Sequence, residues 1–225
     1  MITLYISLYH TDSLKRKNDI LTCLNQNLKN RFIDRIVVLN EGFDDEILDS
    51  SKIQLIQISS RPNFSDFYEY LDCNSVNIIA NNDIRFDASL QYLKLLLLKN
   101  ADLLSLTRIE KNGDLLRKEE GDTQDAWIFK GKAACLQYCD FNMGKLGCDG
   151  RINYIFYKGG YRVLNPSKFI SIFHEHSLPF SDHLESERIE GPYLFTKPIG
   201  FLAFHINRIV LYYISKYRVA FFYTK

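Results

Sequence analysis

Short apolar segments that each run into a polar cluster are the feature of this sequence that most constrains its fold. Residues 2–8 alternate apolar and polar side chains, and shorter apolar runs cover 36–39, 53–58 and 76–80. Such runs, bounded by turn-forming residues, predict β-strands. Strands that alternate with helical segments form a parallel sheet with helices on its faces. We therefore expect an α/β fold with a mostly parallel central sheet flanked by helices.

The intervening segments show helical spacing. Leu14, Leu21, Leu24 and Leu28 predict one helix, with the basic run at 15–17 away from its apolar face. Further helices are expected at 64–71, 90–98 and 151–157, further strands at 103–107, 126–129, 161–164 and 169–173, and a charged loop at 108–124.

Length, charge and cysteine content exclude several classes of protein. The 225 residues suit one domain with a small appendage. Lys and Arg number 28 against 27 Asp and Glu, so no overall field favours a nucleic-acid partner. Five scattered cysteines give no disulfide framework and fit a reducing compartment. No apolar run approaches the roughly 18 residues that a membrane span needs, and no basic region marks a signal peptide. We expect a cytoplasmic protein, with peripheral contact to a membrane as an option.

Polar residues follow the predicted strands at Tyr9, Asn40, Arg61 and 81–83. Ligands of parallel sheets bind beyond the carboxyl ends of the strands, so these positions are candidates for a binding site. In the last cluster, Asp83 beside Asn81 and Asn82 could hold Mg²⁺ or Mn²⁺ through oxygen ligands. The same three residues also make an ordinary turn.

Three later motifs add candidates for chemistry. Asp149, in a glycine-flanked bend that opens a helix, could be a general base or a helix cap. His174 and His176 point to the same side of a predicted strand end, where imidazole could ligate the metal or serve the structure. Trp127 could stack on a sugar ring, and the neighbouring Asp125 carboxylate could accept hydrogen bonds from the hydroxyls of that sugar. Trp127 could equally be a core residue.

The chain resembles the small GT-A-fold glycosyltransferases over roughly residues 1–180. The resemblance lies in the order along the chain of the segments 81–86, 124–129 and 147–149 and the two late histidines. The resemblance implies a GT-A-like, Rossmann-like fold. It also implies transfer of a sugar from a nucleotide-sugar donor to a hydroxyl of a glycan or lipid-linked glycan, as in polysaccharide or surface-glycan synthesis.

By the same resemblance, Asn81 and Asp83 stand at the metal-binding DxD motif and a late histidine completes the Mn²⁺ or Mg²⁺ site. Asp149 corresponds to the base of inverting members, and Arg61 and the end of the first strand lie near the nucleotide. Asn81 departs from the motif, since it leaves the metal one negative ligand fewer.

Two alternatives remain open. One is a non-catalytic glycan-binding or scaffolding domain. The other is a sugar nucleotidyltransferase, which would need a glycine-rich phosphate loop after the first strand, whereas residues 8–18 contain no glycine.

The last 35 residues differ in composition from the rest. Residues 191–225 carry five basic residues and no acidic ones, together with ten aromatics. Phe201, Phe204, Ile209, Tyr212 and Tyr213 could line one helical face, which suits either an anionic membrane surface or packing on the domain or a dimer partner. We expect 1–190 to be the catalytic domain and to fold without 191–225.

Overall fold

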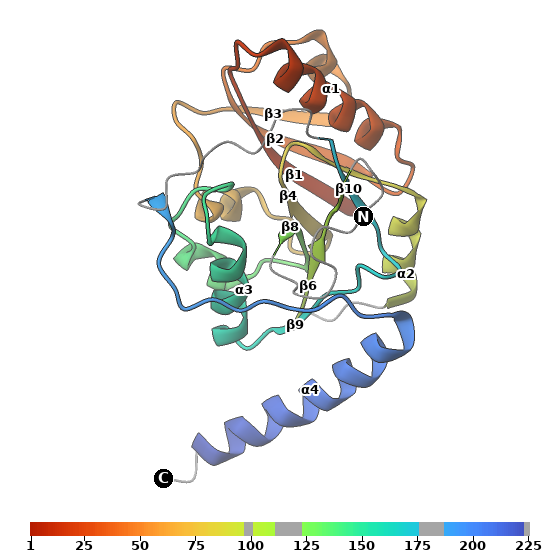
Figure 1. Ribbon diagram of the computed structural model, residues 1–225, viewed down its shortest axis with the longest axis vertical. Coiled ribbons are helices and arrows are strands. Elements are labelled where there is room, and N and C mark those ends of the chain that lie inside the picture. The colour runs from red at the N-terminus through yellow and green to blue at the C-terminus, as the bar shows by residue number, and fades with distance from the viewer. Residues whose placement is uncertain (97–100, 111–122, 176–186, 223–225) are drawn as a thin grey trace.

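The computed structural model describes residues 1–96, 101–110, 123–175 and 187–222 (Figure 1). The strands are β1 (Ile2–Tyr9), β2 (Arg35–Glu41), β3 (Ile53–Gln57), β4 (Val76–Ala80), β5 (Ile84–Phe86), β6 (Asp102–Thr107), β7 (Ile109–Glu110), β8 (Gln124–Lys130), β9 (Arg162–Leu164) and β10 (Ile172–His174). The α-helices are α1 (Leu14–Lys29), α2 (Tyr92–Leu96), α3 (Cys148–Lys158) and α4 (Phe201–Phe222). The 3₁₀ helices are η1 (Glu46–Asp49), η2 (Phe64–Tyr70), η3 (Ala88–Gln91) and η4 (Ala134–Tyr138).

A seven-stranded sheet in the order β3-β2-β1-β4-β8-β6-β9 forms the centre, and β5-β10-β7 form a second, small sheet. Neighbours from β3 to β4 are parallel, as are β6 and β9, whereas β8 is antiparallel to both β4 and β6. The predicted α/β class with a mostly parallel sheet is confirmed. Because β8 runs backwards, Ala126 near its start pairs with Ala80 at the end of β4. The start of β8 therefore lies at the edge where the parallel strands end.

The two faces of the sheet bury separate cores, as the period-two pattern requires. Leu4 and Ile6 of β1 face the side covered by α1, α2 and α4, whereas Tyr5 faces the side covered by η2, η4 and α3. Residues at alternate positions of β2 divide in the same way. Both faces of the inner strands are thus covered, and the ends of these strands are left to carry a site.

The buried face of α1 differs from the predicted one. It contains Ile20, Cys23, Leu24 and Asn27, whereas Leu14 is 78% exposed. Asn27 is accommodated because its amide donates to the Ile84 carbonyl at 2.9 Å and its carbonyl oxygen accepts from the Phe86 amide at 2.9 Å. A prediction based on leucines alone assigns the wrong face of the helix to the core, and it therefore places Arg16 on the solvent side.

Several other predicted segments differ from the structure in their bounds or type. The predicted strand at 169–173 begins only at Ile172, because the Pro166 carbonyl accepts from the amides of Phe169 and Ile170 and holds this stretch in a turn. The helix expected at 151–157 begins at Cys148, and the one at 64–71 is a 3₁₀ helix. The charged stretch at 108–124 includes β7 and the first residue of β8, and its residues 111–122 lie outside the described part.

The chain after residue 190 is hydrogen-bonded to the domain and is not a separate tail. The amide of Leu194 donates to the Gly150 carbonyl at 2.9 Å, and a Cβ on Gly150 would lie 2.7 Å from the Phe195 ring. Further on, Phe204 is fully buried in the core, and Arg208 binds the buried Asp102 at 2.8 Å. The proposed boundary at 190 therefore divides segments that pack on each other. Loss of residues 191–225 would expose Gly150 and α3, and the folding of 1–190 without them stays a prediction.

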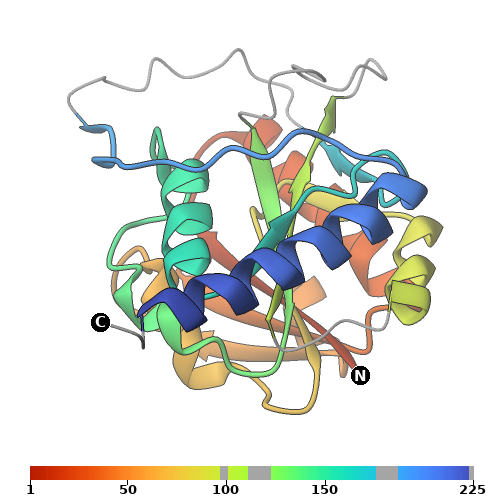
Figure 2. The same ribbon diagram turned by 90° about the horizontal axis from the view of Figure 1, so that it is seen from below.

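The C-terminal helix α4 crosses the underside of the body (Figure 2). It is 22 residues long, but none of the described helices is both long and apolar enough to cross a bilayer.

Candidate active site

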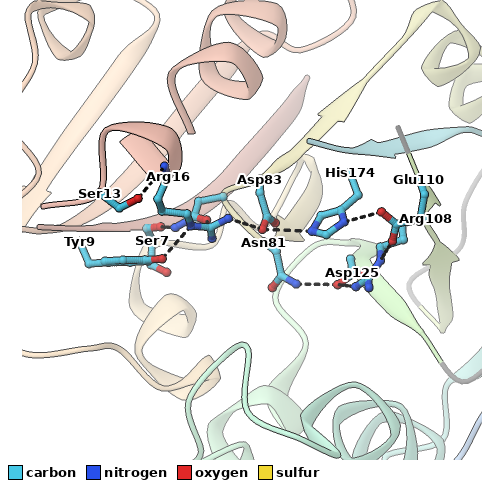
Figure 3. Close-up of polar contacts among 11 residues, drawn as sticks. Ser7, Tyr9, Ser13, Arg16, Asn81, Asp83, Arg108, Glu110, Asp125 and His174 are labelled. Atoms are coloured by element: carbon cyan, nitrogen blue, oxygen red, sulfur yellow. Dashed lines mark hydrogen bonds and ion pairs between the residues drawn. The ribbon is translucent and has the colours of Figure 1, made fainter. Parts of the chain in front are cut away.

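The two sheets meet around Asp83, which lies in the turn between β4 and β5. In the small sheet, β10 pairs with β5 on one side and with β7 on the other. This register sets His174 opposite both Ile84 and Glu110. His174 therefore lies between the Asp83 turn and the end of β7, although the three residues are far apart in sequence (Figure 3).

The Asp83 carboxylate is buried and bound by the side chains of Arg16 and His174. Its Oδ2 accepts from Nη1 of Arg16 at 2.7 Å and lies 3.2 Å from Nε2 of His174. Burial alone would raise the pKa of Asp83, but the hydrogen bond from His174 and the charge of Arg16 hold it well below its ordinary value. Asp83 is therefore a permanent negative charge at the carboxyl edge of the sheet.

Arg16, which the sequence pattern missed, is fixed by three partners. Besides Asp83, its Nε donates to the Tyr9 hydroxyl and its Nη2 to Oδ1 of Asn82, both at 2.9 Å. Asn82 in turn donates to the Ser7 carbonyl at 2.9 Å. These bonds aim the guanidinium at the end of β1, with its side chain 14% exposed. Arg16 lies four residues before Ile20 and therefore on the buried face of α1, and this spacing is the feature of the sequence that could have identified it.

A second set of contacts extends from His174 to β8. Nδ1 of His174 lies 2.9 Å from Oε2 of Glu110, and Nε of Arg108 donates to Glu110 at 2.7 Å. Burial opposes the charge on His174, but the hydrogen bond to Asp83 outweighs it and raises the pKa of the imidazole. Arg108 also binds Asp125 at 3.1 Å. The sequence pattern identified neither Arg108 nor Glu110 as part of a site.

Asp125 joins this network to the end of β4. Its Oδ1 accepts from the amide of Asn81 at 2.7 Å. Burial raises the pKa of Asp125, and the charge of Arg108 opposes that rise. Asn81 is therefore held by a neighbouring strand through its nitrogen. Among the predicted residues, Tyr9, Asn81, Asn82, Asp83, Asp125 and His174 all belong to one connected set of contacts (Figure 3).

Asp149 lies next to this network at the first turn of α3. Its carboxylate accepts from the amides of Gly150 at 3.0 Å and Gln124 at 3.4 Å, and Gln124 directly precedes Asp125. Burial, followed by the nearby charge of Asp125, raises the pKa of Asp149 to about 6. A carboxylate with this pKa is ionised at neutral pH yet basic enough to accept a proton from a substrate.

The residues at Asp83 fit a divalent cation if a ligand completes its coordination. The described part of the chain contains no group of three or more His, Cys, Asp or Glu side chains placed as metal ligands. However, Oδ1 of Asp83 is buried and has no hydrogen-bond partner there. His174 also carries on Nδ1 the carboxylate partner that is usual for metal-bound imidazole. Mg²⁺ commonly uses one or two carboxylates together with phosphate oxygens and water.

The remaining predicted residues lie elsewhere. The prediction for Trp127 is wrong: it is 1% exposed and packs edge-on against Phe64 at 5.0 Å, so no sugar can stack on it. Arg61 donates to the Met143 carbonyl at 2.7 Å and so ties two loops together. Asn40 is buried and bonds both backbone groups of Phe43, which braces the turn after β2. His176 lies outside the described residues.

A separate hollow of ≈ 630 Å³ opens between the end of β3 and η2. Its lining includes the carboxylates of Asp66 and Glu69 but no Lys or Arg. This charge pattern does not suit an anionic ligand.

No protein-family model and no curated protein sequence matches the chain. Solved structures resemble it in fold, among them the following two. One is the mannosyltransferase PcManGT from Pyrobaculum calidifontis in complex with GDP-Man and Mn²⁺, with a TM-score of 0.56, 12% identity and coverage of 81% of this chain and 58% of that one. The other is TarS from S. aureus in complex with UDP-GlcNAc, with a TM-score of 0.59, 13% identity and coverage of 84% and 61%. The chain thus spans less than two thirds of either structure, and the likeness establishes the GT-A fold.

Proposed function

We propose that this chain, which has the GT-A fold, is a glycosyltransferase that moves a sugar from a nucleotide-sugar donor to an acceptor hydroxyl. The observation that carries the proposal is the position of Asp149. Its carboxylate has a pKa of about 6 and accepts from the amide of Gln124. The next residue, Asp125, is joined through Arg108 and Glu110 to His174 of the buried Arg16–Asp83–His174 cluster at the carboxyl edge of the sheet. A general base beside a charged binding cluster is what displacement by a hydroxyl requires.

Asp149 is the proposed base. It removes the proton of the acceptor hydroxyl as that oxygen attacks the anomeric carbon of the donor sugar. The bond from this carbon to the leaving phosphate oxygen breaks, and its electron pair departs with the nucleoside diphosphate. Attack opposite the leaving group inverts the anomeric centre, so we expect an inverting enzyme.

The Arg16 guanidinium is the proposed partner of the departing diphosphate. Arg16 is held by Tyr9, Asn82 and Asp83, and these three bonds use three of its five N–H groups. The other N–H groups suit phosphate oxygens, which arginine binds through paired hydrogen bonds. A fixed cation at the leaving group stabilises the charge that develops there without having to reorganise.

Mn²⁺ or Mg²⁺ is the proposed cofactor: Asp83 would hold it through Oδ1, and His174 would hold it through Nε2 once that nitrogen has given up its proton. When bound, the ion supplies further positive charge to the leaving diphosphate. Glu110 orients the imidazole through Nδ1, and Arg108 in turn holds Glu110 in place. Asn81 and Asp125 hold the end of β4 against β8 and so fix the position of Asp83.

For the acceptor, we propose a hydroxyl of a glycan or lipid-linked glycan, as in surface-polysaccharide synthesis. Asp125 is 5% exposed and engaged by Arg108 and Asn81, so its part in holding the acceptor is indirect. We propose that the protein acts in the cytoplasm.

A panel of nucleotide sugars that includes GDP-mannose and UDP-N-acetylglucosamine tests the proposal. Release of nucleoside diphosphate is measured with Mn²⁺ and with a chelator. We expect at least one donor to be turned over by the wild-type chain and by Asp45→Asn, which replaces a capping carboxylate on η1. Asp149→Asn should bind the same donor but release little diphosphate. Binding of a donor without turnover by the wild-type chain would instead favour a non-catalytic binding domain.

A further inference from the structure

The helix α4 has one side that packs on the domain and an opposite side that no described residue of the domain covers. Phe204, Arg208 and Leu211 follow one another at helical spacing and face the domain. Phe204 packs against Phe169, and Arg208 binds both Asp102 and the carbonyl of Leu96. This stripe fixes the orientation of the helix on the body.

The opposite stripe consists of Leu202, Ile206, Ile209 and Tyr213. These residues recur at steps of four, three and four, so they lie on one side of the helix. They are offset by two positions from the docked stripe, which is about half a turn. Each of the four side chains is more than half exposed. A row of large apolar side chains along one side of a helix is unusual on a free surface and marks an interaction site.

The charge of the surrounding chain indicates what covers this stripe. Residues 191–225 carry Lys197, Arg208, Lys216, Arg218 and Lys225 and no acidic residue. Arg208 is bound to Asp102, so the sequence of this segment supplies four further basic residues. An exposed apolar stripe within a purely basic segment suits the surface of an anionic bilayer, where side chains enter the headgroup region and the cations meet lipid phosphates.

We infer that α4 binds an anionic phospholipid surface through the stripe Leu202-Ile206-Ile209-Tyr213 and lies along that surface. A second copy of this chain fits less well, because a two-fold contact through the same stripe would bring two acid-free basic segments together. The inference is independent of the proposed function, since it needs neither donor nor catalysis. For an enzyme with a lipid-linked acceptor, it would place the domain at the membrane that carries its substrate.

Flotation of the full chain with lipid vesicles tests the inference. The vesicles are pure phosphatidylcholine, or phosphatidylcholine with about one third phosphatidylglycerol. The test variant is Ile206→Gln/Ile209→Gln, which keeps helix propensity and alters exposed side chains only. The control is Leu95→Gln, the same kind of change at one side chain on α2 that is 61% exposed. Thermal unfolding checks that each variant is folded, and analytical ultracentrifugation gives its oligomeric state.

We expect the wild-type chain and Leu95→Gln to float with the anionic vesicles, to bind phosphatidylcholine weakly, and to be released by high salt. The double variant should bind anionic vesicles at least about tenfold less well, because it loses the burial of two aliphatic side chains. Absence of vesicle binding by the wild-type chain would overturn the inference. So would equal binding to both vesicle types, or a wild-type dimer that the double variant converts to a monomer.

Discussion

Replacement of Asp149 by asparagine should stabilise the protein while it removes activity. The carboxyl group has an ordinary pKa of 3.8 and a pKa of about 6 in the folded chain, because burial and Asp125 disfavour its charge. A difference of about two units corresponds to about 3 kcal/mol of free energy of unfolding. The folded state holds this proton more tightly than the unfolded state does. The group therefore stabilises the fold at low pH, and this stabilisation is lost as the pH rises from about 4 through about 6.

The side-chain amide of the Asp149→Asn variant carries no charge to desolvate, so the variant escapes this loss. We expect its gain in stability over the wild-type chain to be larger at pH 8 than at pH 5, by about 1 kcal/mol. The gain falls short of the full value of about 3 kcal/mol because one amide oxygen replaces two carboxylate oxygens that accept from Gly150 and Gln124. Urea unfolding at the two pH values measures the difference.

Turnover of the same variant should fall by roughly 10²–10⁴-fold, the usual effect of losing a positioned base. In the wild-type chain, kcat/KM should rise with pH through about 6 and then level off, since only the ionised carboxylate accepts a proton. A variant that is less stable than the wild-type chain at pH 8 would refute the account of the site's electrostatics. Retained turnover would refute the role of Asp149 as base.

Two further substitutions test features in which the structure differs from the prediction made from the sequence. Phe204→Ala should lower the free energy of unfolding by about 3–5 kcal/mol, because it empties a fully buried position, and unchanged thermal stability would show that α4 does not belong to the core. Trp127→Phe should leave the KM for the acceptor unchanged, because the ring is buried and its Nε1 has no hydrogen-bond partner among the described residues; a raised acceptor KM with unchanged stability would return Trp127 to the binding site.

The central sheet could be predicted from the sequence because most of its strands are buried on both faces and contain short apolar runs. The parts that failed depend on contacts between distant residues. β10 lies between β5 and β7, and only this pairing brings Glu110 to His174. The buried face of α1 includes Asn27, whose polar side chain is satisfied by β5, and a search for apolar residues overlooks it.

The residues of the candidate site that lie at the ends of strands could be predicted from the sequence. Asp83 and Asn81 follow β4 directly, and His174 ends β10. Arg16 was missed because its partner Asp83 lies 67 residues further along the chain. Trp127 was misassigned because the sequence places an aromatic ring next to Asp125 but does not show which side of β8 is covered by Phe64.

Calorimetric titration with nucleoside diphosphates in the presence of Mn²⁺ tests the central claim most directly. The variants are Arg16→Gln and Asp83→Asn, and the control is Asp12→Asn, an exposed carboxylate in the same loop between β1 and α1. Unfolding curves confirm that each variant is folded at the temperature used. We expect at least one diphosphate to bind the wild-type chain and Asp12→Asn equally, and to bind the two site variants at least about tenfold more weakly, because each loses a charged contact worth about 1.4 kcal/mol or more. Equal affinity in all four proteins, or no binding of any diphosphate to the wild-type chain, would contradict a donor site at Asp83.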